Sequence, residues 1–456
     1  MALGKIGPHR YRAGEGEPCR SRIGGCRTGL GRAAIEIPNV FSQAAGYRLW
    51  ANTSRKHGKD PPMVRARKSS VVVVALAALV CTVVRPQIHT AAADVVRFQH
   101  PGVLVGDKQL TFVQDRLAAG AEPWKSAFAD LQASRYAALD WQAKPRATVE
   151  CGSSSKPNNG CSDERDDSMA AYTDALAWAL TKDQRYADKA IQIMDAWSAT
   201  IREHTNTNAP LQTGWSGNNW SRAAELIRYT GAGWAAASID RFATMLRDVY
   251  APLLTPGSPR KNGNWELIQA DALLGIAVFL DDNDLFGQAI TLWRNRLPAY
   301  IYLTTDGPRP VPPPNAGITD PDALIKYWQG QSTFVDGLAQ ETCRDFGHTG
   351  WGFEAAAQAA ETARLQGVDL WSEGRDRLVK ALEFHTAYDN GADVPDWLCD
   401  GSVKTGLGPA VQLAFNEYHS REGMPMPQTE RYVAAHSPFE VNYFIGWETL
   451  TDTGAP

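Results

Sequence analysis

The chain has 456 residues, of which 44% are hydrophobic and 21% are charged, a composition typical of globular proteins. Residues 1–70 contain 14 Lys and Arg against 4 Asp and Glu, so the rest of the chain carries 32 basic and 46 acidic residues. An acidic main body argues against non-specific binding to nucleic acids. It also means that an anionic substrate would need a locally positive site.

The amino-terminal part of the sequence has the features of an export signal. Residues 1–62 are rich in Arg, Gly and Pro without sustained periodicity, and we interpret them as a misassigned or disordered extension. Residues 63–93 combine a basic start, the apolar run 71–84 and small residues at the end, as in a secretory signal peptide. The apolar run is too short to span a membrane. We therefore expect translation to start at Met63, and the secreted chain, free of the membrane, to start at Asp94.

Four cysteines remain in the expected mature chain, because Cys19, Cys26 and Cys81 precede it. An even number of cysteines in an exported protein suggests disulfides, and we predict the pairs Cys151–Cys161 and Cys343–Cys399. The rival interpretation is a zinc site, but no CxxC pair or neighbouring histidine has the required spacing. We expect neither a metal ion nor another cofactor.

Helical periodicity dominates residues 94–456 and repeats at intervals of about 50 residues. The predicted helical pairs are 167–180 with 186–200, 221–229 with 239–250, 265–279 with 285–300, and 351–365 with 371–385. Such an array of antiparallel helical hairpins predicts an all-α fold in a single domain, and closed on itself it forms an (α/α) toroid. The polar loops between helices, among them 214–219 and 337–350, are expected to line one end.

The stretch 340–350 concentrates ionisable side chains between two apolar patterns. If it is helical, Gln340, Arg344 and His348 share one face. Gly347 and Gly350 instead favour a loop that leads into the next helix, and both readings stay open. Asp345 could orient the imidazole of His348, and Arg344 could neutralise a carboxylate. The alternative for Arg344 is a plain internal ion pair with Glu341 or Asp345.

Two further clusters contain amide and aromatic side chains. In the first, Asn264 follows an Asn-Gly turn, so it is predicted to cap the next helix, although it could also point into a cavity. The second comprises Trp215, Asn218, Asn219 and Trp220, which could form a sugar platform or an ordinary turn. Near the end of the chain, Tyr418 is flanked by Asn, Glu, His and Arg, which is unusual for a core tyrosine.

The sequence resembles the alginate-lyase-domain polysaccharide lyases, in particular polysaccharide lyase family thirty-eight. The matching stretches are 100–102, 122–125, 262–267, 340–349 with its Arg-Asp-x-Gly-His motif, 366–370, 416–419 and 447–450. The resemblance implies an (α/α) toroid and metal-free β-elimination on a uronic-acid polymer. The implied catalytic residues are Asn264, Arg344, His348 and Tyr418. Many relatives have a histidine where this chain has Trp265 or Glu417.

The resemblance assigns roles to these residues. Asn264, together with Arg344 or Gln340, would neutralise the uronate carboxylate. His348 would act as base and Tyr418 as acid, or Tyr418 would do both when the proton and the leaving group lie on one face of the sugar. The further residues expected to bind substrate are Gln340, Trp265, Asn218, Asn219, Trp220 and Glu341. We predict a monomeric, secreted lyase acting on glucuronan or alginate.

Two alternatives to a lyase remain, a glycoside hydrolase and a non-catalytic glycan-binding protein. The hydrolase would have to use Glu341 and Asp345. Four positions apart on one helix, these carboxylates would lie on the same side of a substrate, whereas hydrolysis needs carboxylates that flank the bond.

Overall fold

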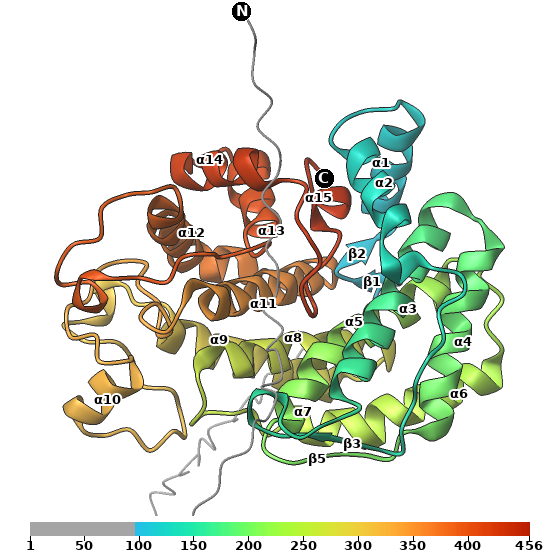
Figure 1. Cartoon of the computed structure of the whole chain (residues 1–456), viewed down its shortest axis with the longest axis horizontal. Coiled ribbons are helices and arrows are strands. Elements are labelled where there is room, and N and C mark those ends of the chain that lie inside the picture. The colour runs from blue at the N-terminus through green and yellow to red at the C-terminus, as the bar shows by residue number, and fades with distance from the viewer. Residues whose placement is uncertain (1–95) are drawn as a thin grey trace, which may run out of the picture. The chain divides into compact units, whose positions relative to one another are not determined.

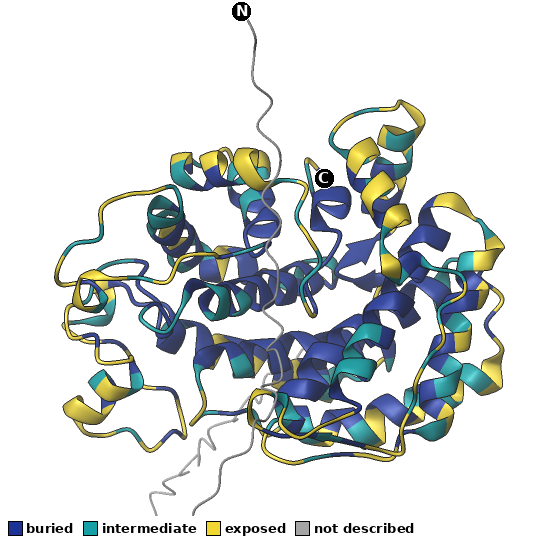
Figure 2. Ribbon diagram, viewed as in Figure 1, coloured by how far each residue is buried: buried dark blue, intermediate teal, exposed yellow. Residues whose placement is uncertain are grey.

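Four long helices, buried on nearly all sides, form the centre of the protein. The computed structural model describes residues 96–456 (Figure 1). The inner helices pack side by side in the order α3 (Cys161–Thr181), α5 (Ala209–Tyr229), α8 (Gly263–Phe279) and α11 (Phe346–Leu365). Most of their residues, polar ones included, are buried, because neighbouring elements cover nearly every face of these helices. Figure 2 shows these helices in dark blue, with the exposed residues on the elements around them.

Outer helices cover the inner ones. α4 (Gln184–Thr200), α9 (Asn283–Tyr300) and α12 (Leu370–Asp389) pack on α3, α8 and α11, while α6 (Ala236–Met245) packs on α4. The sequence of α4 explains its position, because its buried residues recur every three or four places: Ala187, Ala190, Ile193, Met194 and Trp197. Turns of only a few residues join the inner and outer helices, so each pair is antiparallel. The predicted all-α fold of helical hairpins is confirmed.

Aspartates begin four of these helices. Asp183, Asp282, Asp345 and Asp369 occupy the position before α4, α9, α11 and α12, and each side chain accepts a hydrogen bond from a backbone N–H of the first turn. An aspartate at this position satisfies a donor that has no partner inside the helix and interacts favourably with the helix dipole.

Shorter elements connect and close the array. The remaining helices are α1 (Asp107–Ala118), α2 (Trp124–Ala133), α7 (Ala251–Leu254), α10 (Pro321–Tyr327), α13 (Gln412–Phe415), α14 (Pro427–His436) and α15 (Glu448–Thr451). The strands β1 (Gly102–Val103) and β2 (Val105–Gly106) form an antiparallel pair. A second sheet has β3 (Thr148–Cys151) between β4 (Asn158–Asn159), which is antiparallel, and β5 (Glu203–Thr205), which is parallel.

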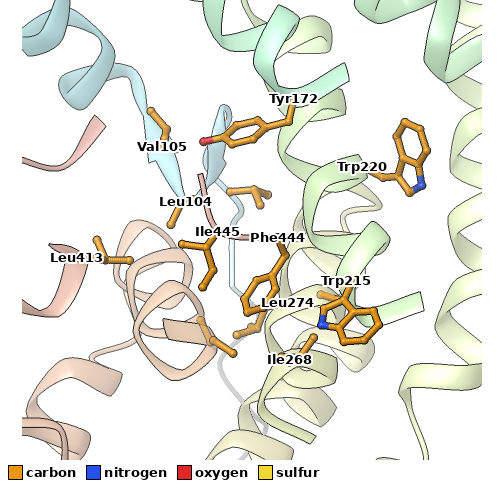
Figure 3. Close-up of a cluster of buried hydrophobic side chains, with 14 of the residues drawn as sticks. Leu104, Val105, Tyr172, Trp215, Trp220, Ile268, Leu274, Leu413, Phe444 and Ile445 are labelled. Atoms are coloured by element: carbon orange, nitrogen blue, oxygen red, sulfur yellow. The ribbon is translucent and has the colours of Figure 1, made fainter. Parts of the chain in front are cut away.

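A non-helical segment near the carboxyl terminus enters the centre of the helical array. Phe444 and Ile445 are fully buried there, among side chains of α5 and α8 such as Trp215, Ile268 and Leu274 (Figure 3). The buried Arg222 of α5 donates a hydrogen bond to the carbonyl oxygen of Phe444 at 2.6 Å. This anchoring brings the preceding residue, Tyr443, to the end of the inner helices.

The predicted loop 214–219 is helical in the structure. It lies inside α5, where Gly214 allows close packing on α8: a Cβ at this position would come within 2.8 Å of the Ile268 side chain. The expected extension 1–62 and signal peptide 63–93, with Cys19, Cys26 and Cys81, lie outside the described residues. Within residues 96–456, no helix combines the length and apolar character needed to cross a membrane.

Candidate active site

The stretch 340–350 folds as a turn that leads into a helix. Residues 340–345 form turns, and α11 begins at Phe346. Asp345 precedes the helix, and its Oδ1 accepts a hydrogen bond from the backbone N–H of His348 at 2.8 Å. The single-helix reading, with Gln340, Arg344 and His348 on one face, is therefore wrong. The turn instead places Arg344 and Asp345 on opposite ring nitrogens of His348.

A chain of hydrogen bonds fixes the state of His348. Its Nδ1 lies 2.8 Å from both carboxylate oxygens of Asp345, and its Nε2 lies 2.8 Å from Nη2 of Arg344. A guanidinium group can only donate, so Nε2 accepts and Nδ1 carries the proton that is donated to Asp345. The imidazole is thus held as the neutral tautomer with a basic Nε2. About a third of the His348 and Arg344 side chains is exposed.

Two carboxylates, one with a lowered and one with a raised pKa, hold His348 and Arg344 in place. Burial would raise the pKa of Asp345, but hydrogen bonds from the ring and backbone of His348 outweigh it and hold the pKa below its usual value. Glu341 is fully buried, and burial raises its pKa although Arg344 opposes the shift. Its carboxylate accepts hydrogen bonds from Arg344 at 2.7 Å and from Tyr300 at 3.2 Å. Glu341 therefore holds Arg344 from the buried side of the site.

Asn264 joins the site from α8. It is the second residue of the helix, so the predicted capping role is wrong: Asn262 precedes the helix, and its side chain makes no capping hydrogen bond. The Asn264 amide donates weakly to Glu341 Oε1 at 3.5 Å and to the carbonyl of His348 at 3.4 Å. Its buried Oδ1 has no hydrogen-bond partner among residues 96–456. This oxygen can accept a hydrogen bond from a ligand.

These residues line a cavity of about 380 Å³. The lining residues are Ser153, Ser154, Ser155, Asn208, Leu211, Trp215, Asn264, Trp265, Arg344, His348, Trp351 and Tyr443. Three aromatic rings pack together on one wall, with the centroid of Tyr443 at 4.9 Å from both Trp215 and Trp351. The buried indole N–H groups of Trp215 and Trp351 have no acceptor in the described part of the chain. Aromatic rings beside such polar groups suit a sugar ligand.

Tyr418 does not meet the other predicted catalytic residues. It lies in a π-helical turn at Asn416–Arg421, is fully buried and donates its hydroxyl to the carbonyl oxygen of Trp371 at 2.9 Å. Two of its polar neighbours, Glu417 and Arg421, belong to an ion-pair network in which Arg421 also contacts Glu361. The unusual sequence around Tyr418 thus reflects a buried structural cluster. Tyr443 is the tyrosine that lines the cavity with His348.

Several predicted substrate-binding residues are engaged elsewhere. Gln340 is buried, with its Oε1 accepting from Gly263 N at 2.9 Å and its Nε2 donating to Tyr327 O at 2.6 Å. Asn218, Asn219 and Trp220 are buried in the middle of α5, one turn further along the helix than Trp215, and they do not line the cavity. Glu341 supports Arg344 without lining the cavity, whereas Trp265 lines it as expected.

Both predicted disulfides form, and each is adjacent to the site. Cys343–Cys399 lies directly before Arg344, and Cys151–Cys161 closes the loop that contributes Ser153, Ser154 and Ser155 to the cavity wall. No local sequence signal marks these serines or Tyr443. Their position depends on segments that meet only in the folded chain.

Comparisons with known proteins find similarity to alginate lyases over part of the chain. The family model described as Alginate lyase matches residues 125–309, a range that contains Asn264 and ends before Arg344. No curated protein matches the chain. Among solved structures, a histidine-to-alanine variant of alginate lyase A1-III complexed with a tetrasaccharide is similar, with a TM-score of 0.51 and 16% identity over 71% of this chain and 88% of that chain.

Two further alginate lyase structures are similar. The apo form of the same variant has a TM-score of 0.50 and 15% identity over 77% of this chain and 95% of that chain. An alginate lyase from Bacteroides ovatus has a TM-score of 0.49 and 14% identity over 77% of this chain and 99% of that chain. The chain thus matches the Alginate lyase family model over residues 125–309 and shares the (α/α) toroid fold of paired helices with alginate lyases.

Proposed function

We propose that the protein cleaves a uronic-acid polymer, glucuronan or alginate, by β-elimination. The observation that carries this proposal is the neutral His348, held between Asp345 and Arg344 at an aromatic cavity. A uronan offers one weakly acidic proton, at C5 beside its carboxylate. A base next to a carboxylate-binding cation is the arrangement that can remove this proton.

Arg344 is proposed to bind the carboxylate of the sugar that is cleaved, and Asn264 to bind a hydroxyl group of that sugar. The carboxylate would accept the Nη2 hydrogen bond that His348 Nε2 now accepts, and this exchange leaves Nε2 free to act as a base. Glu341 keeps the guanidinium in place through Nη1. Neutralising the carboxylate stabilises the enolate-like intermediate that forms when C5 loses its proton. The orphan Oδ1 of Asn264 can accept a hydrogen bond from a sugar hydroxyl.

His348 is proposed as the base and Tyr443, in place of Tyr418, as the acid. His348 Nε2 takes the C5 proton, the C–H electrons form the C4–C5 double bond, and the C4–O bond breaks. The leaving glycosidic oxygen takes the proton of the Tyr443 hydroxyl, which solvent then restores. The Tyr443 side chain is 37% exposed at the cavity, and its hydroxyl makes no hydrogen bond within residues 96–456. Asp345 stabilises the imidazolium that forms.

The test is a screen of glucuronan, alginate, hyaluronan and pectate for an unsaturated product that absorbs in the near ultraviolet. We expect absorbance to grow with glucuronan or alginate. New reducing ends without this absorbance would identify a glycoside hydrolase instead, and binding that survives His348→Ala together with Tyr443→Phe, without any product, would identify a glycan-binding protein. The tetrasaccharide bound by the similar A1-III variant supports a polysaccharide substrate.

Export is part of the proposal. Two disulfides among the described residues are typical of proteins that fold in an oxidising compartment. Amino-terminal sequencing of the secreted protein should find Asp94 as its first residue. Recovery of residues 1–62 in the secreted chain would contradict this.

A further inference from the structure

A second cavity adjoins the candidate active site. It has a volume of about 300 Å³ and is lined by Tyr136, Ser162, Arg165, Asp166, Val441, Asn442 and Tyr443. Tyr443 lines both cavities, so the second one begins where the proposed acid is placed. A polymer that runs through the active site therefore has room for a further sugar beyond Tyr443.

Arg165 of α3 is the charged group between the two cavities. Its guanidinium lies over the rings of Tyr443, at 4.8 Å, and Trp215, at 5.3 Å. It donates hydrogen bonds to Gln212 Oε1 at 2.8 Å and to Ser162 Oγ at 3.1 Å, both of which are neutral acceptors. Burial lowers the pKa of Arg165, and the negative neighbours that oppose this shift do not cancel it.

Arg165 forms no ion pair within residues 96–456, in contrast to other buried guanidinium groups. Arg222 pairs with Asp271 at 3.0 Å, and Arg296 pairs with Glu266. A partly buried cation without a carboxylate partner is costly, because burial removes its hydration without replacing it by an opposite charge. This cost is offset when the ligand brings the missing negative charge.

The acidic residue of the second cavity does not compete for this role. Asp166 accepts hydrogen bonds from Arg135 at 2.8 Å and from the Tyr136 hydroxyl at 3.0 Å, so its charge is already balanced. The remaining lining residues next to Arg165 are neutral. The cavity thus offers an incoming anion one positive charge that no carboxylate among residues 96–456 contacts directly.

We propose that Arg165 binds the carboxylate of the sugar next to the one that is cleaved. This inference rests on the proposed function and deepens it. With Arg344 in one cavity and Arg165 in the other, productive binding uses two carboxylates on consecutive sugars. The enzyme therefore selects polymers in which every sugar is a uronate and discriminates against polymers in which uronates alternate with neutral sugars.

The test uses glucuronan, or alginate if that is the polymer cleaved, with half of its carboxyl groups chemically reduced at random. If only the cleaved sugar needs a carboxylate, kcat/KM should fall in proportion to the remaining carboxylates, about twofold. If two consecutive carboxylates are needed, it should fall with the square of that fraction, about fourfold. We expect the fourfold loss for the wild type and the twofold loss for Arg165→Gln.

On the fully carboxylated polymer, Arg165→Gln should lower kcat/KM by about tenfold to a hundredfold, as for the loss of one charge-assisted hydrogen bond. The matched control is Arg185→Gln on α4, which removes the same charge from a residue that pairs only with Asp183 at the surface. A twofold loss for the wild type, or a fourfold loss retained by Arg165→Gln, would overturn the proposal. An arginine that merely positions Tyr443 would lower activity on both polymers without changing this ratio.

Tryptophan fluorescence separates this inference from the proposed function, because Trp215 and Trp351 line the cavity. If no uronan yields an unsaturated product, β-elimination is wrong. The Arg165 subsite then stands if fully carboxylated oligouronate quenches the wild type at concentrations at least tenfold lower than Arg165→Gln needs. It falls if both proteins bind the oligouronate equally.

Discussion

Removal of a single tyrosine hydroxyl distinguishes the two candidate acids, Tyr443 and Tyr418. Tyr443→Phe removes the hydroxyl at the cavity and keeps the ring that packs on Trp215 and Trp351. General acid catalysis contributes about 10²- to 10⁴-fold to a rate, so we expect kcat to fall by that factor. The loss corresponds to about 3 to 5 kcal/mol of transition-state stabilisation. KM should change little, because the aromatic wall remains.

Tyr418→Phe is the matched control. The side chain is fully buried, and its hydroxyl makes one hydrogen bond to the carbonyl oxygen of Trp371. Loss of such a neutral hydrogen bond costs about 1 kcal/mol of the free energy of unfolding. We expect a Tm lowered by about 2 °C and an unchanged kcat. The two variants thus separate a catalytic from a structural tyrosine.

Initial rates of ultraviolet-absorbing product measure kcat and KM, and thermal unfolding followed by circular dichroism measures Tm. The assignment of Tyr443 would be refuted if Tyr443→Phe kept wild-type kcat while Tyr418→Phe, folded as judged by circular dichroism, lost it. That result would return the role of acid to Tyr418.

Three further variants test the supports of the site. Cys343→Ser with Cys399→Ser should lower the free energy of unfolding by about 4 kcal/mol, because the disulfide closes a 56-residue loop and restricts the unfolded chain. The double variant should also raise KM, because Arg344 is held less firmly. Denaturant unfolding that shows no loss of stability would contradict the first expectation. Asp345→Asn keeps a residue that can begin α11 but removes the charge that stabilises the imidazolium of His348. We therefore expect kcat to fall on the order of 10²-fold with unchanged helix content. A wild-type kcat would exclude that Asp345 supports His348 in catalysis. Burial raises the pKa of Asp174 to about 8, against the opposing effect of Lys189, and neither of its oxygens has a partner among the described residues. The contribution of Asp174 to stability is fully present below about pH 4, where the carboxyl group is protonated in both the folded and the unfolded chain, and it is lost as the pH rises to about 8. The stability of Asp174→Asn relative to the wild type should therefore grow by up to about 1.4 kcal/mol per pH unit between these two pH values. Urea unfolding at both ends of the window measures this difference, and a pH-independent difference would show that Asp174 ionises normally.

The sequence by itself determined the helical pairs α3–α4, α8–α9 and α11–α12, both disulfides and part of the site. Helical periodicity is a local property, and short polar turns between apolar helices leave little choice other than antiparallel packing. Arg344, Asp345 and His348 lie within five residues, so the geometry of one turn joins them. Whether that turn was helical could not be decided locally, because the glycines and the aspartate cap compete with the helical spacing.

Tertiary structure decided which tyrosine meets His348. Arg421, near Tyr418, forms ion pairs with Glu417 and with Glu361 on α11, and Glu361 is a partner that the local sequence does not reveal. The segment around Tyr443 carries no motif, and its position follows from the buried Arg222 that holds the Phe444 carbonyl and from Asn219, which holds the Tyr443 carbonyl at 3.1 Å. The position of the Tyr443 hydroxyl thus depends on contacts between residues that lie far apart in the sequence. The types and spacing of neighbouring side chains do not reveal such contacts.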